Sequence, residues 1–541
     1  MSTYKSPTTG DAIVEGLLAH DVDTVFGIPG VQTYGLYDAL ARAKDRITVY
    51  GARHEQTAAY MAFGYAQATG RPGVCSVVPG PGVLNAGAAL LSAYGASAPV
   101  VCLTSEIPAA AMGRGLGHLH EMPDQLATLK TFTKWAANIM HPAEAPELVA
   151  EAFFQATSGR PRPVALAAPW DVLPARAAVP ACVPRQVHPP DPDAEQIDRA
   201  LELLATAVNP MIMVGSGAQH ASADVLALAT KLQAPVVSLR GGRGIVSNEH
   251  PLGFTCAEGF ERWADTDVLI GIGSRLELVW SRWASRPPGL KIILIDIDPM
   301  QHVRLDADIR IVADSAAACR VLTDGVTSRS SREAEFLTVR SEKSVEVAQL
   351  QPHIDHLLGI RRALPRDGFF VEEICQVGFA SYFGFPVYEP RTFITCGHQG
   401  TLGFGFPTAL GVKAAFPDRA VVSINGDGGF MFAAQELATA VQFGLNVVAV
   451  VFDNNAFGNV LNDQRRLFNG RALGSELRNP DFVAFARSFG AEGVGVASPR
   501  ELERAVRVAI DANVPTLIHV PMPLDANVTP WPLLMPAARR Q

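Results

Sequence analysis

The sequence AVVSINGDGGFMFAAQELATAVQFGLNVVAVVFDNNAFG occupies residues 420–458 and predicts a strand, a helix and a second strand. Residues 421–424 form an apolar run typical of a buried parallel strand, and Asp427 follows it. The amphipathic segment between the two runs predicts a helix. A second apolar run, 447–452, leads into Asn454. Because the carboxyl ends of parallel strands meet at one sheet edge, Asp427 and Asn454 are expected to lie side by side, where ligands bind.

Asp427 and Asn454 supply a carboxylate and an amide carbonyl, which are the ligands that hard divalent cations prefer. The glycines beside Asp427 let the backbone approach a ligand closely. The helix that opens after them offers unpaired N–H groups to an anion. Together these features predict Mg2+ or Ca2+ bridging a diphosphate. For Gly-Asp-Gly alone, a simple turn is the competing interpretation, and the strand–helix–strand context with Asp-Asn-Asn argues against it.

The stretch resembles the thiamine diphosphate motif, in which Gly-Asp-Gly is followed after a helix and a strand by Asn-Asn or Asp-Asn. The family that it resembles is the acetolactate synthase and 2-keto acid decarboxylase superfamily. The resemblance implies Mg2+ held by Asp427, Asn454 and the main-chain carbonyl of Ala456. It also implies cofactor contacts from the residues around these ligands, namely Gly426, Gly428, Gly429, Phe457 and Gly458.

Composition limits the other classes of function. The chain has 541 residues, too many for one core, and predicts three domains of about 180 residues each. A net charge of −8 without a basic stripe argues against nucleic acid or an anionic membrane as partner. Seven scattered cysteines without a CxxC pair favour a reducing cytoplasm over a disulfide framework or zinc site. The polar N-terminus predicts no signal peptide, and no apolar stretch is long enough to predict a membrane span.

Apolar strands alternate with helices along the whole chain, which predicts an α/β protein of three doubly wound domains with mostly parallel sheets. We expect an N-terminal domain at 1–185, a middle Rossmann-like domain at 192–345 and a C-terminal domain at 355–541, with a proline-rich linker after the first. The resemblance covers essentially the whole chain. It implies that the first domain binds the pyrimidine of thiamine diphosphate and the third its diphosphate and Mg2+.

Glu55 begins a helix just after a strand, in the sequence Arg-His-Glu. From this fragment alone, a carboxylate that stabilises the positive helix end explains it. The family resemblance assigns it a second role. Enzymes of this group place a glutamate of a similar sequence on the pyrimidine N1′, where a shared proton helps the 4′-amino group to generate the C2 ylide. We therefore predict that Glu55 is catalytic.

Two further loops of the first domain resemble the family's cofactor-facing loops. Pro29 and Gly30 fall in the loop that faces the thiazolium, and Gln32 follows as a candidate substrate contact. Pro81 and Asn85 fall in the loop that packs on the pyrimidine. Pro-Gly sequences form turns in any protein, so these loops carry little information by themselves.

The segment Gly115–Pro123 departs from acetolactate synthases, which have phenylalanine and glutamine where Leu119 and His120 stand. Decarboxylases of the superfamily often place histidines here, and a histidine can protonate a carbanion or relay a proton. We predict His118 and His120 as catalytic candidates. A surface-loop histidine is the competing interpretation for His118.

In the third domain, Gly397, His398, Gly400 and Leu402 lie in a segment that resembles the family's loop under the cofactor. Leu402 stands where a bulky apolar side chain supports the bent cofactor. In the middle domain, Arg275 matches one of two arginines that bind a non-redox FAD in acetolactate synthases, but the second position is Val279. The sequence thus leaves FAD open without supporting it.

The resemblance implies a thiamine diphosphate- and Mg2+-dependent lyase or carboligase that acts on 2-keto acids, aldehydes or acyloins through a C2 ylide and an enamine. Acetolactate synthase-like carboligation is the first hypothesis; 2-keto acid decarboxylation and benzaldehyde lyase-type acyloin cleavage are the alternatives. Asn459 and Asp463 differ from the family's methionine and tryptophan and predict a more polar pocket. A flavin or nicotinamide oxidoreductase and a catalytically silent homologue are the competing classes. Family geometry implies a homodimer or homotetramer with active sites between subunits.

Overall fold

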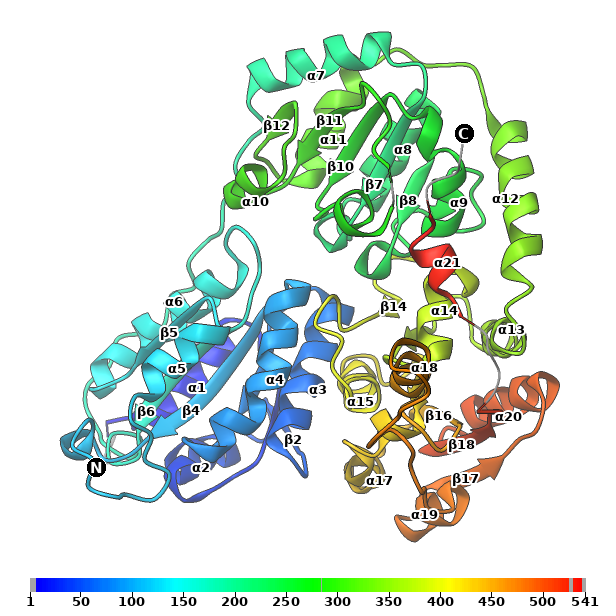
Figure 1. The fold of residues 1–541 in the computed structure, drawn as a ribbon. Helices are drawn as coiled ribbons and strands as arrows, with labels where there is room; N and C mark the ends of the chain where they lie inside the picture. The colour runs from blue at the N-terminus through cyan, green and yellow to red at the C-terminus, as the bar shows by residue number, and fades with distance from the viewer. Residues whose placement is uncertain (1–5, 284, 525–528, 538–541) are drawn as a thin grey trace.

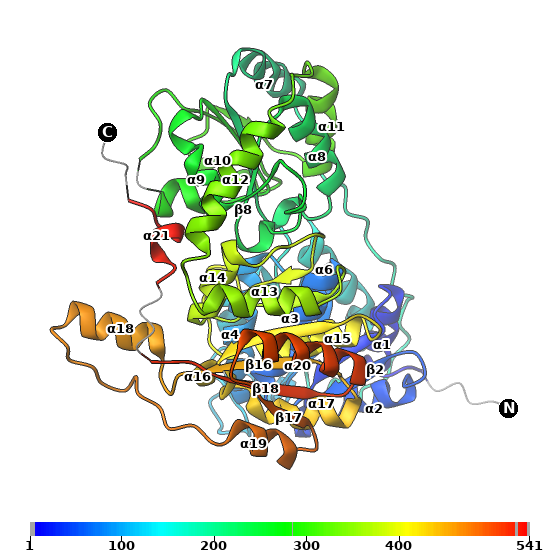
Figure 2. The same cartoon turned by 90° about the vertical axis from the view of Figure 1, so that its right-hand side faces the viewer.

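The computed structural model describes residues 6–283, 285–524 and 529–537 and shows three α/β domains (Figures 1 and 2). Each domain contains a six-stranded sheet in which every pairing of strands is parallel, with helices packed on it. The predicted fold class is confirmed. In the described part of the chain, no helix is long and apolar enough to cross a membrane.

The N-terminal sheet has the strand order β2-β1-β3-β4-β6-β5. Its strands are β1 (Thr24–Gly27), β2 (Thr48–Gly51), β3 (Gly73–Ser76), β4 (Val100–Glu106), β5 (Trp135–Asn138) and β6 (Val164–Pro169). Its α-helices are α1 (Thr9–Ala19), α2 (Tyr34–Arg42), α3 (Glu55–Thr69), α4 (Pro81–Ala96), α5 (Gln125–Phe132) and α6 (Ala145–Thr157). Every residue of β3, β4 and β6 is buried, which explains their continuous apolar runs.

The middle sheet has the order β12-β11-β10-β7-β8-β9, the strand order of a Rossmann fold. Its strands are β7 (Pro210–Val214), β8 (Val236–Ser238), β9 (Gly253–Thr255), β10 (Val268–Ile272), β11 (Lys291–Ile295) and β12 (Ile309–Ile311). Its α-helices are α7 (Ala194–Thr206), α8 (Ser222–Leu232), α9 (Cys256–Glu261), α10 (Pro299–Arg304) and α11 (Ser315–Gly325), and α12 (Glu333–Val347) leads to the third domain. The short edge strands β9 and β12 were not predicted, because three residues give too little periodicity.

The C-terminal sheet has the order β14-β13-β15-β16-β18-β17, which repeats the N-terminal order strand for strand. Its strands are β13 (Phe369–Val371), β14 (Phe393–Ile394), β15 (Val421–Gly426), β16 (Val448–Asp453), β17 (Glu492–Gly495) and β18 (Thr516–Pro521). Its α-helices are α13 (His353–Ala363), α14 (Gln376–Gly384), α15 (Gly405–Ala415), α16 (Asp427–Phe430), α17 (Leu437–Phe443), α18 (Gly458–Leu467), α19 (Phe482–Ser488), α20 (Pro499–Ala512) and α21 (Trp531–Leu534).

The segment after β15 differs from the single amphipathic helix that the sequence predicts. The one-turn α16 is followed by a short 3-10 helix, η8 (Ala434–Glu436), and then by α17. The break lets Glu436 reach the first domain, where its buried carboxylate accepts hydrogen bonds from the Arg53 amide at 2.9 Å and the Thr57 hydroxyl at 2.5 Å. A contact between domains therefore overrides the local helical pattern.

The first and third domains pack through α3 and α15, which lie side by side (Figure 1). Glycines on both helices permit this approach. A Cβ on Gly64 would lie 2.1 Å from the Thr408 carbonyl oxygen, and one on Gly411 would lie 1.9 Å from the Met61 carbonyl oxygen. Because side chains at either glycine would force the backbones apart, the sequence itself sets the spacing of these two domains.

Candidate functional site

Asp427 and Asn454 lie at adjacent strand ends, as predicted from their positions after two apolar runs. Gly426 of β15 pairs in register with Phe452 of β16, so the two strands end next to each other at the same edge of the sheet. A cavity of about 140 Å3 opens at this edge. It is lined by Asp427 and Asn454 and by most of the other predicted third-domain residues, namely Leu402, Gly426, Gly428, Gly429, Ala456, Phe457 and Gly458. We call this cavity the Asp427 pocket.

The Asp427 carboxylate is buried and held by its own domain. Its Oδ2 accepts hydrogen bonds from the Ala456 amide at 3.2 Å and from Asn479 Nδ2 at 2.7 Å. Asn479 Nδ2 also donates to Oδ1 of Asp453 at 2.7 Å, and His519 Nε2 lies 2.9 Å from Oδ2 of Asp453. One amide thus joins two carboxylates at the ends of neighbouring strands.

The pKa values of the two carboxylates are shifted in opposite directions. Burial and the charge of Asp453 together raise the pKa of Asp427 to about 6, although the hydrogen bond from Asn479 acts in the opposite direction. Burial also acts to raise the pKa of Asp453, but hydrogen bonds from His519, the Asn455 amide and Asn479 together lower it. Asp427 is therefore a buried carboxylate whose charge lacks a full counterpart.

The donor set around Asp427 fits a divalent cation with oxygen ligands. Asn454 lines the same cavity, and Gly458 leaves room for its side chain, because a Cβ on Gly458 would lie 2.5 Å from Asn454 Nδ2. Ala456 pairs with Glu476 in an isolated antiparallel β-bridge, whose hydrogen bonds use the Asn455 carbonyl and the Phe457 amide. The Ala456 carbonyl takes no part in this bridge. Carboxylate, amide and main-chain oxygen are the ligands that Mg2+ or Ca2+ prefers. No cluster of three or more acidic, His or Cys side chains that could hold a metal occurs among the described residues.

A buried glutamate ties the loop that carries Leu402 to the glycines beside Asp427. Glu373 Oε1 accepts a hydrogen bond from the Gly403 amide at 2.5 Å, and its Oε2 accepts one from the Gly405 amide at 2.8 Å. A Cβ on Gly429 would lie 2.6 Å from Glu373 Oε1. Burial raises the pKa of Glu373 to about 7. The carboxylate therefore holds the backbone next to Leu402 in place where Leu402 lines the Asp427 pocket.

The predicted residues of the first domain form a separate group, and none of them lines the Asp427 pocket as described. Glu55 begins α3 and is half-buried, and its Oε2 accepts a hydrogen bond from Asn85 Nδ2 at 3.0 Å. Pro81 opens α4, one turn before Asn85. The pairing of Glu55 with Asn85 brings together two residues that the sequence separates by 30 positions.

Gln32 contacts the loop that carries His120. Gln32 is 4% exposed and donates from Nε2 to the Leu119 carbonyl at 3.0 Å, while its Oε1 is buried and has no hydrogen-bond partner among the described atoms. His120 has a left-handed φ of 64°, and its Nδ1 is likewise buried without a partner there. His118 is exposed. A Cβ on Gly80 would lie 2.5 Å from the His120 carbonyl oxygen.

Pro29 and Gly30 approach the same edge from β1. Gly30 has an extended backbone, and a Cβ there would lie 2.4 Å from Val78 Cγ1. The loops after β1 and β3 are therefore in close contact, as two loops around one ligand would have to be.

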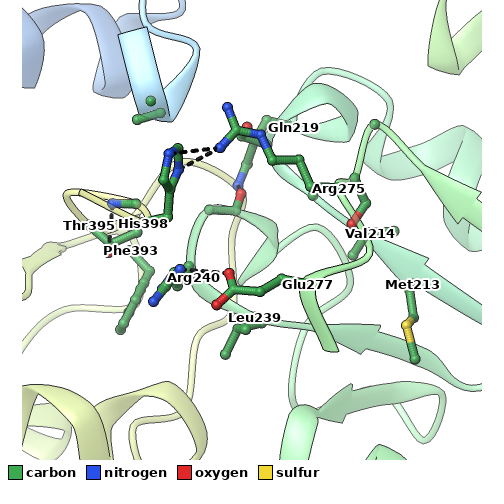
Figure 3. Close-up of a pocket in the computed structure, with 18 of the residues that line it drawn as sticks. Met213, Val214, Gln219, Leu239, Arg240, Arg275, Glu277, Phe393, Thr395 and His398 are labelled. Atoms are coloured by element: carbon green, nitrogen blue, oxygen red, sulfur yellow. Dashed lines mark hydrogen bonds and ion pairs between the residues drawn. The ribbon is translucent and has the colours of Figure 1, made fainter. Parts of the chain in front are cut away.

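Gly397 and His398 lie at a different cavity from Asp427, one of about 350 Å3 that residues of all three domains line (Figure 3). The Arg275 guanidinium lies against the His398 ring, and Arg240 pairs with Glu277 at 2.6 Å. Burial, together with the positive charges of neighbouring arginines, lowers the pKa of Arg275 to about 10. Gly400 lines neither cavity as described and has a φ of 62°. FAD binding near Arg275, which the sequence leaves open without supporting it, is not tested by these contacts.

Several polar residues at the Asp427 pocket were not predicted from the sequence. Asn479 and His519 act on Asp427 and Asp453 from distant loops and strands, and no local motif marks them. Gln376 lines the pocket from the start of α14, and His353 lines it from the start of α13.

The comparisons with known proteins agree with this architecture. The three thiamine pyrophosphate enzyme family models match in order: the N-terminal TPP binding domain at residues 7–128, the central domain at 197–322 and the C-terminal TPP binding domain at 374–520.

The similar curated proteins span nearly the whole chain. A protein named "Probable 2-ketoarginine decarboxylase" from Pseudomonas aeruginosa is 35% identical over 96% of this chain and 95% of its own. A "Probable acetolactate synthase large subunit" from Methanocaldococcus jannaschii is 33% identical over 94% of this chain and 91% of its own. The acetolactate synthase isozyme 3 large subunit of Escherichia coli is 29% identical over 97% and 96%.

Two outer domains of one topology, a Rossmann-like domain between them and a Gly-Asp-Gly loop at a parallel-sheet edge define the class of thiamine diphosphate-dependent enzymes. The relatives narrow this class. The chain belongs to the acetolactate synthase-like family of thiamine diphosphate enzymes, which form or break carbon–carbon bonds.

Proposed function

We propose that this protein is a Mg2+- and thiamine diphosphate-dependent lyase or carboligase that acts on 2-keto acids, aldehydes or acyloins. The observation that carries the proposal is the convergence of Asp427, Asn454 and the Ala456 segment on one cavity. These residues would hold Mg2+ and, through it, the cofactor diphosphate. The relatives named for acetolactate synthesis favour carboligation as the first candidate reaction.

The bound cofactor would supply a nucleophilic thiazolium carbon that attacks the keto carbon and accepts the electrons of the broken bond. The chain's own part begins with Glu55, which would hold the proton shared with the pyrimidine N1′. Asn85 donates to Glu55 Oε2 and so fixes the direction of that carboxylate. Leu402, held in place through Glu373, would support the bent cofactor from below.

Gln32 and His120 would act on the substrate. The Oε1 of Gln32 and the Nδ1 of His120 are buried polar atoms without partners among the described residues, and such atoms usually find a ligand or water. His120 would give or take the proton at the substrate carbon or oxygen. His118, on the exposed side of the same loop, would be the second proton carrier.

The two groups of residues call for more than one subunit. Glu55 and its neighbours lie outside the Asp427 pocket of their own chain. We therefore place Glu55 of one subunit against the Asp427 pocket of another, in a homodimer or homotetramer with C2-related sites.

A second candidate reaction, 2-keto acid decarboxylation without carboligation, is favoured by one relative and one residue. The relative named for 2-ketoarginine is 35% identical, and Asn459 gives the Asp427 pocket a polar wall. Acyloin cleavage is the reverse of carboligation and uses the same groups.

One experiment separates these reactions. The purified protein, loaded with thiamine diphosphate and Mg2+, is offered 2-keto acids of neutral and charged side chains, with and without an acceptor aldehyde, and acyloins alone. CO2, aldehyde and acyloin are followed together. Acyloin formation from two keto acids supports carboligation, and aldehyde with CO2 supports decarboxylation. No cofactor-dependent turnover on any substrate of the panel would overturn the proposal.

A further inference from the structure

The Asp427 pocket contains a buried histidine that the proposed function has not used. His353 is the first residue of α13 and is 1% exposed, yet it lines the cavity. Its Nδ1 is buried and has no hydrogen-bond partner in the described part of the structure. A buried polar atom of this kind costs free energy unless a ligand or water satisfies it.

The charge of the pocket explains why such a group is needed. The described residues that line it include no lysine or arginine, while Asp427 contributes a negative charge. A diphosphate carries several negative charges, and one Mg2+ shared with Asp427 offsets only some of them. The remaining phosphate oxygens require hydrogen-bond donors from the protein.

The helix next to His353 supplies part of the same site. The first turn of α14, including Gln376 and Val377, lines the cavity. Cys375 Sγ accepts the Gly378 amide at 3.3 Å, which positions this turn. The first-turn amides of a helix point toward anions. His353 adds to this helix start a buried polar side chain whose Nδ1 has no hydrogen-bond partner among the described residues.

The ionisation of His353 is consistent with a hydrogen-bond donor held in a dry site. Burial, with a smaller contribution from the neighbouring His356, lowers its pKa to about 4, although the Gln376 side chain acts in the opposite direction. The imidazole is therefore neutral at physiological pH, with one N–H and one acceptor nitrogen. A bound anion next to the ring would favour the arrangement in which the ring donates.

We propose that His353 binds the diphosphate of the cofactor, donating from its buried ring together with the first-turn amides of α14. This inference rests on the proposed function, because it takes thiamine diphosphate as the ligand of the pocket. His353 thereby becomes a cofactor-binding residue that reaches the pocket from a helix preceding the first strand of the domain.

The test measures binding rather than turnover. Dissociation constants for thiamine diphosphate and for inorganic pyrophosphate, both with Mg2+, are determined calorimetrically for the full chain and its variants. The loss of one hydrogen bond to a charged phosphate weakens both ligands, so we expect His353→Ala to raise both constants about tenfold or more. His353→Gln keeps a donor and is expected to lie between the wild type and His353→Ala.

His356→Gln is the matched control. His356 lies one turn along the same helix, contacts the Pro352 carbonyl through Nδ1 at 2.7 Å and packs on Phe452, but it does not line the cavity. It should change both constants far less than His353→Ala does, because His356 reaches the pocket only through its neighbours His353 and Phe452. Circular dichroism and the thermal midpoint of each variant show whether it is folded.

The outcomes separate the two proposals. Constants for His353→Ala within about twofold of the wild type, in a folded variant, would overturn the role of His353, and so would an equal loss in His356→Gln. If the wild type binds pyrophosphate with Mg2+ but not thiamine diphosphate, the proposed function is wrong, while the pyrophosphate constants of the variants still decide the role of His353. If the wild type binds neither, both proposals are wrong.

Discussion

The first and third domains have the same strand order, but they differ in how far the polar groups near their strand ends are hydrogen-bonded. In the third domain, the polar groups at the strand ends satisfy one another, since Asn479 and His519 engage Asp427 and Asp453. In the first domain, Gln32 Oε1, in the segment after β1, and His120 Nδ1, in the segment after β4, are buried without partners in the described part of the chain. The third domain therefore carries a hydrogen-bonded group around Asp427 and Asp453, which we call the anchor. The first domain carries buried polar atoms that a ligand could satisfy.

This difference teaches how the work is divided. An anchor for a metal and a diphosphate must exist before the cofactor arrives, because its ligands bind strongly charged groups. The catalytic edge needs unpaired donors and acceptors that only the reacting groups satisfy. Changes in the third domain should thus affect binding, and changes in the first should affect turnover.

The largest expected effect is that of Asp427→Ala. It removes the carboxylate at the base of the anchor, so Mg2+ and thiamine diphosphate affinity should fall by more than the roughly 100-fold that loss of an outer-shell partner costs. Calorimetry with each ligand measures this loss. Asp511→Ala, which removes an exposed carboxylate on α20 of the same domain, is the control. Wild-type affinity in Asp427→Ala would show that the third domain is not the anchor.

Glu55→Gln should have the opposite profile. It keeps the shape and the contact with Asn85 but loses the charge, so turnover should fall by roughly 10²- to 10⁴-fold, as for loss of an acid–base group. Thiamine diphosphate affinity should change by less than about tenfold. The rate is measured at saturating cofactor on whichever substrate the wild type accepts. Full turnover would remove Glu55 from the mechanism.

Mixing these two variants tests whether the halves of one site come from two subunits. Refolded or co-expressed mixtures of Asp427→Ala and Glu55→Gln should regain roughly a quarter of wild-type activity, because half of random dimers are mixed and each restores one of two sites. The control is each variant mixed with itself. If the mixture stays inactive while mixed dimers form, both halves of a site belong to one chain.

Asn479→Ala should have a smaller effect that is confined to the anchor. Asn479 contacts Asp427 rather than the metal, and loss of such a partner costs about 10- to 100-fold in metal affinity. Saturating Mg2+ should then restore most of the turnover. Asn479→Asp should be worse, because it places a third carboxylate beside Asp427 and Asp453. Equal Mg2+ affinity in the wild type and in Asn479→Ala would show that the hydrogen bonds from Asn479 to Asp427 and Asp453 do not contribute to metal binding.

The same contrast explains what the sequence could predict. Asp427 and Asn454 were predicted because each follows an apolar run, and the register of β15 and β16 brings such ends together. The sheets of the outer domains share an order that no sequence repeat reveals, because buried apolar strands of one topology tolerate different residues. Asn479 and His353 escaped prediction because only tertiary packing carries them to the pocket.

The smallest expected effect concerns stability and follows from the first strands of the two outer domains. β13 leads into Glu372 and Glu373, both fully buried, whereas β1 leads into the uncharged residues Ile28 and Pro29. Burial raises the pKa of each glutamate to about 7. Carboxyls with a raised folded pKa stabilise the protein below their unfolded pKa, and this contribution is lost as the pH rises toward 7.

Glu372→Gln should therefore reduce the pH dependence of stability of the cofactor-free protein. The wild type should lose up to about 1.4 kcal/mol per pH unit and carboxyl between the unfolded pKa and pH 7, and Glu372→Gln should lose less. Urea midpoints at pH 5, 6 and 7 measure the slope. Glu249→Gln, whose carboxylate is exposed and pairs with Arg366, should keep the wild-type slope. An unchanged slope in Glu372→Gln would mean that Glu372 is ionised throughout, and the buried end of β13 would then differ less from that of β1 than its burial implies.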